Sequence, residues 1–123
     1  MKIDLHIHTT ASDGTWTPEE LLTEAKKVGL GALAVTDHDS VGNVLATQQL
    51  ARVAGLKFLT GVELNSTKAG LNFHVLGYGL DIENKALQEL MANNIQLLED
   101  VDVGSIALLE KEGWPVSVAE FAH

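Results

Sequence analysis

The spacing of apolar residues along this chain alternates between two periods, and each period predicts one kind of element. The opening segment KIDLHIH alternates apolar and polar residues, which is typical of a strand, here over 2–8. LGALAVTD is a short apolar run that predicts a buried strand over 32–36. LKFLTGVEL and LNFHVLGYGL predict two more strands, over 57–64 and 71–78.

Apolar residues at helical spacing separate the first three of these strands. In TWTPEELLTEAKKVG, Thr17 has the position and side chain of an N-cap, and Pro18 suits the first helical position. Glu20 stands three residues after Thr17, which is the signature of a capping box. The segment therefore predicts a helix over 18–28 that ends at Gly29.

Two further helices are predicted downstream. One is expected over 41–54, with Asp39 or Ser40 as its N-cap. The other is a long stretch over 84–112, in which a break near Gly104 is left open. The order of strand, helix, strand, helix and strand favours parallel pairing with right-handed crossovers, so the predicted fold class is α/β. Folds of this class bind ligands at the carboxyl ends of their strands.

Composition narrows the function classes. The chain has 123 residues, 46% of them hydrophobic, which suits one domain or part of a larger one. It has no cysteine, which excludes disulfides and cysteine-ligated metal sites. No apolar run is long enough for a membrane helix, and MKIDLHIH does not read as a signal peptide, so a cytoplasmic location is expected.

The net charge of the chain indicates which binding partners are unsuitable. Eight Lys and Arg stand against seventeen Asp and Glu, which gives a net charge of −9. The cations are scattered along the chain, so binding to a long nucleic acid is not expected. An anionic substrate would need something other than basic side chains to neutralise it.

Histidines and carboxylates supply that alternative. His6 and His8 are two apart on a strand, so their side chains leave one face about 6.6 Å apart along it and can converge on one metal ion. Taken alone, the pair also fits a half-exposed polar strand. Asp13 in SDG fits an ordinary turn aspartate as well as a ligand. His38 follows a strand directly, where an α/β fold puts its chemistry.

Two more residues fall in the third and fourth strands. Glu63 ends an apolar strand, where burial without a partner would cost several kcal/mol, so it is either a solvated end residue or a metal ligand. His74 has apolar neighbours and could equally be a hydrogen-bonded core residue. The joint pattern puts four of the five histidines and two carboxylates at or near one expected edge, which favours zinc, manganese or iron. His123 is given no role.

Four ordered motifs, DLHIHT…SDG, TDHD, GVELN and FHVLGYG, resemble the PHP family, the polymerase and histidinol phosphatase domain. They are most similar to its stand-alone branch of small metal-dependent phosphoesterases, over residues 3–81. The resemblance implies the N-terminal part of a distorted (β/α)7 TIM-like barrel over 1–81. It also implies that 82–123 is the start of a helical insertion.

The resemblance further implies a site for up to three divalent ions, Mn, Zn, Fe or Mg. His6 and His8 would hold the first ion, with Glu63 bridging it to a second. The second would also be bound by His74. Asp13 and His38 would hold the third. Glu63 and His38 are the residues expected to carry the catalytic role.

The implied activity is hydrolysis of phosphate esters of small nucleotides, such as nucleoside mono- or bisphosphates or short oligonucleotide ends, by a metal-activated hydroxide. A histidinol- or sugar-phosphate phosphatase is the enzymatic alternative. The family completes its site with a later histidine and a D-x-H pair that this chain lacks, and members of the branch are usually more than twice as long. The chain is therefore expected to be an incomplete barrel that can self-associate at an open edge. A catalytically silent metal-binding or interaction module remains the alternative of another class.

Overall fold

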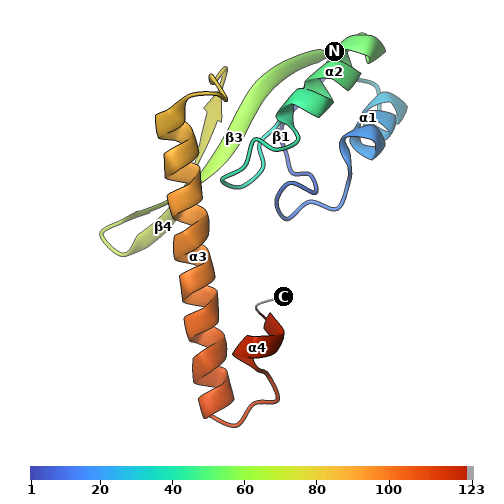
Figure 1. Ribbon diagram of the computed structural model, residues 1–123. Coiled ribbons are helices and arrows are strands. Elements are labelled where there is room, and N and C mark those ends of the chain that lie inside the picture. Colours follow the sequence, from blue (N-terminus) through green and yellow to red (C-terminus); the bar gives the residue numbers. More distant parts are fainter. Residues whose placement is uncertain (122–123) are drawn as a thin grey trace. The chain divides into compact units, whose positions relative to one another are not determined.

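The structure, a computed structural model, describes residues 1–121, so His123 lies outside the described residues. The described part of the chain divides into two compact units, with the boundary between Met91 and Ala92. The elements, drawn in Figure 1, are β1 (Lys2–Ile7), α1 (Pro18–Lys27), β2 (Leu30–Val35), α2 (Val44–Ala54), β3 (Lys57–Lys68), β4 (Leu71–Tyr78), α3 (Lys85–Lys111) and α4 (Val118–Phe121).

The first unit contains a sheet with the strand order β1-β2-β3-β4. β2 pairs in parallel with both β1 and β3, which confirms the α/β prediction for the first three strands. β4 returns antiparallel to β3, and its pairing lengthens β3 to Lys68, four residues beyond the predicted end. The Tyr78 hydroxyl, on β4, donates a hydrogen bond to the Leu5 carbonyl, on β1, at 2.7 Å. The sheet is therefore curled enough for its two outer strands to touch, as in part of a barrel.

The two crossover helices pack against each other and close the core of this unit. α1 begins as predicted, since Glu20 N–H donates to Thr17 Oγ1 at 3.3 Å and Thr17 N–H donates to Glu20 Oε2 at 2.9 Å. The buried core cluster consists of apolar side chains from both helices and from β2, namely Leu21, Leu22, Leu33, Val35 and Ala51.

The predicted start of the second helix is wrong. α2 begins at Val44 with Asn43 as its N-cap, so neither Asp39 nor Ser40 caps it. The reason is local competition, because the Ser40 hydroxyl accepts a hydrogen bond from Gly42 N–H and forms a turn before the helix. Asp39 instead accepts hydrogen bonds from Asn65 on β3.

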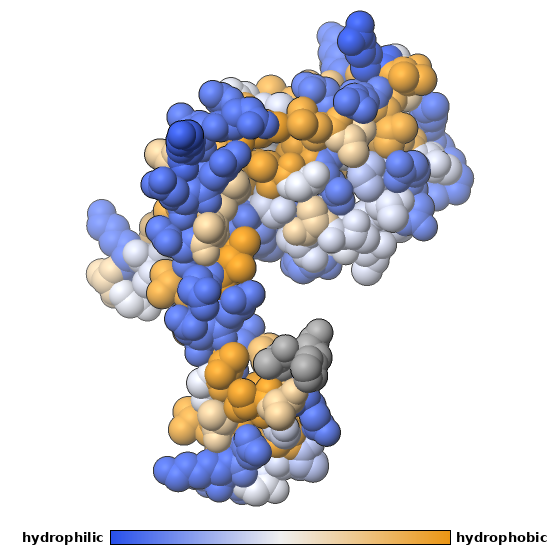
Figure 2. Space-filling view, in the orientation of Figure 1, coloured by the Kyte–Doolittle hydropathy of each residue, from blue (hydrophilic) through white to orange (hydrophobic). Residues whose placement is uncertain are grey.

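α3 continues from Lys85 to Lys111 without a break at Gly104, which agrees with the cost of only about 1 kcal/mol for a glycine inside a helix. In the second unit, apolar side chains gather around the end of α3 and α4 (Figure 2). The division of the chain at 81 and 82 into barrel and insertion stays a prediction. None of the helices in the described residues is long and apolar enough to cross a membrane.

Candidate metal centre

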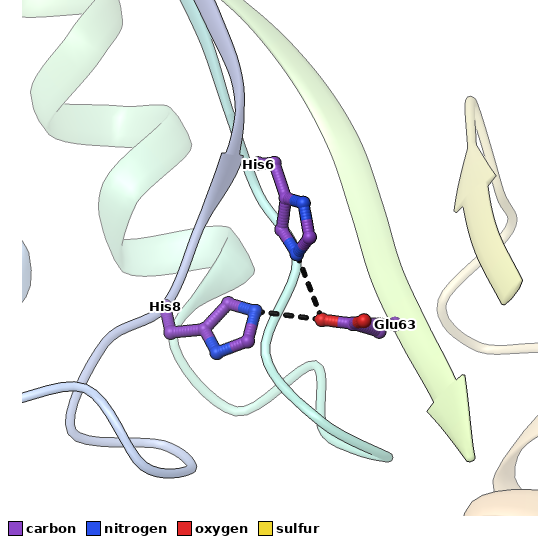
Figure 3. A group of neighbouring side chains, drawn as sticks. All are labelled: His6, His8 and Glu63. Carbon is purple, nitrogen blue, oxygen red and sulfur yellow. Dashed lines mark hydrogen bonds and ion pairs between the residues drawn. The ribbon is translucent and has the colours of Figure 1, made fainter. Parts of the chain in front are cut away.

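Glu63 is the centre of the predicted cluster. Its side chain is only 5% exposed, and its carboxylate lies among four imidazole rings. His6 Nε2 lies 2.8 Å and His8 Nε2 2.7 Å from Glu63 Oε2, as Figure 3 shows. His38 Nε2 lies 3.6 Å from the same oxygen, and His74 Nδ1 lies 2.9 Å from Oε1. A buried carboxylate that meets four imidazoles is a natural place for cations to bind.

All six residues predicted from the sequence come together here. Their ligating atoms form three overlapping groups, each with its atoms within 4.8 Å of one another: His6, His8 and Glu63; His8, Asp13 and His38; and His38, Glu63 and His74. The rings also follow each other in a row. His8 and His38 have centroids 4.7 Å apart, and His38 and His74 have centroids 4.8 Å apart.

The register of β1 aims its two histidines. Asp4 faces Leu33 and Ile7 faces Val35, so β1 takes one more residue than β2 over this stretch. Such an irregularity bends a strand and re-aims its side chains, and it often occurs beside a functional site. Here it falls between Asp4 and Ile7, the stretch that contains His6, and both His6 and His8 reach Glu63.

The loop after β1 brings Asp13 back to His8. Asp13 Oδ1 lies 2.6 Å from His8 Nδ1, and Asp13 Oδ2 lies 3.9 Å from His38 Nε2. Gly14 makes this return possible, because a Cβ atom there would lie 2.4 Å from the carbonyl carbon and oxygen of His8. The loop therefore packs against its own strand at a position where only glycine fits.

The loop after β2 sets His38 beside Glu63. Asp39 N–H donates to the Glu63 carbonyl at 2.9 Å, and Glu63 N–H donates to the Asp37 carbonyl at 3.1 Å. The pairing of the two parallel strands thus continues for one bridge beyond β2, at His38 and Glu63. His38 Nδ1 is buried and has no hydrogen-bond partner among residues 1–121, while Nε2 lies near the carboxylates of Asp13 and Glu63.

His74 reaches the cluster from a different kind of position than the other histidines. It stands in the middle of the antiparallel strand β4, opposite Asn65, and not at a carboxyl end. Because cross-strand neighbours share a face, His74 lies diagonally beside Glu63, which is two residues from Asn65. His74 therefore joins the cluster from the middle of the strand that the sequence predicts over 71–78.

The contacts shift three pKa values. Burial lowers the pKa of His8, but the hydrogen bonds and negative charges of Asp13 and Glu63 outweigh it and raise the pKa above the usual 6.5. The hydrogen bond from His8 holds the pKa of Asp13 below its usual 3.8. Burial raises the pKa of Glu63, but His6 and His38 prevail and bring it below its usual 4.5.

Sequence reasoning missed the polar residues behind the cluster. Asp37 and Thr9 are fully buried, and Asn43 Nδ2 donates to Thr9 Oγ1 at 2.9 Å. The signal for Asp37 was available, since an aspartate that follows an apolar strand directly must find hydrogen-bond partners if it is buried. The sequence alone did not identify those partners.

The chain matches known proteins over most of its length. The family model of the PHP domain matches residues 4–112. A 5′-3′ exoribonuclease from Haemophilus influenzae is 34% identical over 116 residues, which cover 93% of this chain and 42% of the relative. A 3′,5′-nucleoside bisphosphate phosphatase from Chromobacterium violaceum is 38% identical over 85 residues, which cover 69% of this chain and 30% of the relative.

A solved structure agrees with these matches. A protein from Bifidobacterium adolescentis, provisionally described as a metal-dependent phosphoesterase, superposes with a TM-score of 0.79 and 28% identity. The match covers 94% of this chain and 40% of that one, so the chain spans less than half the length of these similar proteins. Family model, relatives and fold agree, and the chain belongs to the PHP domain family.

Proposed function

We propose that the complete protein is a metal-dependent phosphoesterase that hydrolyses phosphate esters of small nucleotides or of short oligonucleotide ends. The observation that carries the proposal is the buried Glu63 carboxylate with four imidazole nitrogens within 3.6 Å of it. Phosphoester hydrolysis is the chemistry for which clustered divalent ions are widely used.

The donor set fits divalent cations. Imidazole nitrogen together with carboxylate oxygen suits zinc, manganese and iron, and the chain has no cysteine to select a softer ion. In the proposed assignment His6 and His8 hold the first ion, and Glu63 bridges it to a second. His74 would bind the second ion, and its Nδ1 already lies 2.9 Å from Glu63 Oε1.

The third ion would be held by Asp13 and His38. Asp13 Oδ2 and His38 Nε2 are 3.9 Å apart, and His8 joins them in one group of ligating atoms. Ligand histidines commonly donate through their second nitrogen to an acceptor. Within residues 1–121, His38 Nδ1 has no hydrogen-bond acceptor.

Glu63 and His38 have different roles in the proposed reaction. Glu63 would hold the cations through both of its oxygens, since Oε1 lies beside His74 and Oε2 lies beside His6 and His8. When bound, divalent ions supply Lewis acidity toward the phosphoryl oxygens and acidify a water molecule. His38, beside Glu63, is proposed to take part in the hydrolysis of the phosphate ester. Cations held in this way reconcile an anionic substrate with a net charge of −9.

The names of the relatives support the substrate class. One is an exoribonuclease and one a nucleoside bisphosphate phosphatase, and both act on nucleotide phosphate esters. A small phosphorylated nucleotide is therefore the proposed substrate. A small substrate also agrees with the scattered Lys and Arg residues of this chain, which form no continuous basic surface for a long nucleic acid.

The test compares the 123-residue chain with the complete product of its gene. Zinc and manganese are titrated into both, and release of phosphate from nucleoside bisphosphates is measured. We expect hydrolysis by the complete protein and little or none by the chain alone, whose Asp13 and His38 site should bind its ion weakly. No metal binding by either form would overturn the proposal. Sedimentation of the chain alone checks the expected self-association at its open sheet edge.

A further inference from the structure

The buried carboxylate of Asp37 lies next to the candidate metal centre in the chain, directly before His38. Asp37 is the second residue after β2, and its side chain is fully buried. Asp37 Oδ1 accepts hydrogen bonds from Thr9 N–H at 2.6 Å and from the Ser12 hydroxyl at 2.7 Å. Asp37 Oδ2 accepts one from the Thr9 hydroxyl at 2.7 Å. The carboxylate thus joins the loop after β1 to the loop after β2.

The sequence positions of these partners are informative. Thr9 directly follows His8, Ser12 directly precedes Asp13, and Asp37 itself directly precedes His38. The three candidate ligands of one group, His8, Asp13 and His38, are therefore each bonded through the backbone to a residue of this hydrogen-bonded cluster. A shift of the carboxylate would move all three ligands.

The direction of the hydrogen bonds around Thr9 makes aspartate necessary. The Thr9 hydroxyl oxygen accepts from Ala11 N–H at 3.2 Å and from Asn43 Nδ2 at 2.9 Å. Because a hydroxyl oxygen has two lone pairs, its own proton must go to Asp37 Oδ2. An asparagine with its amide nitrogen at that place would bring a third donor to the Thr9 hydroxyl, and the flipped amide would set its nitrogen against Thr9 N–H, so either orientation leaves one donor unpaired.

We propose that Asp37 is a positioning residue that holds His8, Asp13 and His38 in the geometry needed to bind a divalent ion. The proposal rests on the proposed function, because it assumes that these residues bind metal. Its own content is that metal affinity depends on a carboxylate that touches neither the metal nor the substrate. Residues that orient ligands typically change metal affinity by about 10- to 100-fold when altered.

The test measures zinc affinity of the chain by competition with a chromogenic chelator. Asp37→Asn should weaken zinc binding by about tenfold or more. The matched control is Asp102→Asn, an exposed aspartate of α3, which should leave the affinity unchanged. The measurement is then repeated in an Asp13→Asn background. There Asp37→Asn should have a much smaller effect, since one of the ligands that it positions is already lost.

Outcomes separate the two proposals. If neither the unaltered chain nor the complete protein binds zinc, the metal centre itself is refuted. If zinc binds but Asp37→Asn matches the control, Asp37 has no positioning role. An undiminished effect in the Asp13→Asn background would mean that Asp37 acts through general stability, which also overturns the proposal.

A milder variant covers the case in which Asp37→Asn does not fold. Ser12→Ala removes the 2.7 Å hydrogen bond to Asp37 Oδ1 and a longer one, at 3.3 Å, to Asp13 Oδ1, and it leaves the Thr9 contacts in place. We expect a several-fold loss of zinc affinity, with circular dichroism like that of the unaltered chain. Unchanged affinity in a folded Ser12→Ala variant, together with an unfolded Asp37→Asn variant, would show that the carboxylate serves the fold alone.

Discussion

The parallel strands and the β3–β4 hairpin bring their residues to the candidate metal centre in different ways. β1 and β2 bring residues at or just beyond their ends, and buried hydrogen bonds hold the following loops in place. The hairpin delivers His74 from mid-strand, where cross-strand register alone places it near Glu63. The side chain of His38 is 22% exposed, whereas that of His74 is 51% exposed.

The difference shows which candidate ligands are held in place by several independent contacts. A ligand on a folded-back loop depends on neighbouring turns, buried carboxylates and glycines. A ligand on a strand depends on backbone pairing between the strands, and the neighbouring residues of the strand maintain this pairing when the ligand is replaced. Changes on the parallel side should therefore disturb the centre more than changes on the hairpin, with Glu63 between the two as the residue both sides share.

The largest effect is expected at Glu63. In the complete protein, Glu63→Gln should lower phosphoesterase activity by more than about 100-fold, because it removes the charge that faces four imidazoles and would bridge two cations. Asp39→Ala should cost less activity, since the Asp39 side chain accepts hydrogen bonds from Asn65 on β3. Phosphate release at matched folded fractions decides between them. Equal losses would place Asp39 in the site.

The next effect compares two glycines. Gly14→Ala should destabilise the chain by about 2–3 kcal/mol or displace its loop, because the added Cβ would lie 2.4 Å from backbone atoms of His8. Gly70→Ala, in the hairpin turn, meets no atom within 4 Å and should cost only about 1 kcal/mol for its positive φ of 78°. Urea unfolding gives both values. A Gly70→Ala variant as unstable as Gly14→Ala would contradict the comparison.

A third experiment compares two histidines by zinc affinity. His8→Ala should weaken zinc binding at least about tenfold more than His74→Ala. His8 contacts both Asp13 and Glu63 and belongs to two of the ligand groups, whereas His74 contacts Glu63 and belongs to one. Chelator competition gives the affinities. If His74→Ala is the more damaging change, the hairpin side dominates the centre.

The smallest effect is a pH dependence of the metal-free chain. The pKa of His8 is raised above 6.5, so its contribution to stability is complete below 6.5 and is lost as pH rises through the folded value. The pKa values of Asp13 and Glu63 are lowered, so the stability that these two carboxylates contribute is lost as pH falls below 3.8 and 4.5. With chelator present, the urea midpoint should fall slightly from about pH 6 to about pH 8. His8→Gln should lack this fall, and an identical fall in that variant would assign it to another group.

The sequence by itself determined the elements and the identity of the candidate ligands. Thr17, Pro18 and Glu20 specify the start of α1 through local hydrogen bonds and a fixed φ, and these need no tertiary partner. Apolar runs identified the first three strands, β1, β2 and β3. Their parallel direction followed from the helices that connect them. The family motifs singled out His6, His8, Asp13, His38, Glu63 and His74, which the structure brings together.

Only the tertiary structure decided how those residues meet. The start of α2 at Val44 depends on whether Asp39 and Ser40 hydrogen-bond to the helix or elsewhere, and β3 supplies the competing partner for Asp39. The antiparallel direction of β4 depends on a hairpin turn, and with it the place of His74 beside Glu63. The role of Asp37 depends on donors 25 and 28 residues away. Short-range patterns determine local structure, whereas the pairing of buried polar groups depends on which distant atoms the fold brings within hydrogen-bond distance.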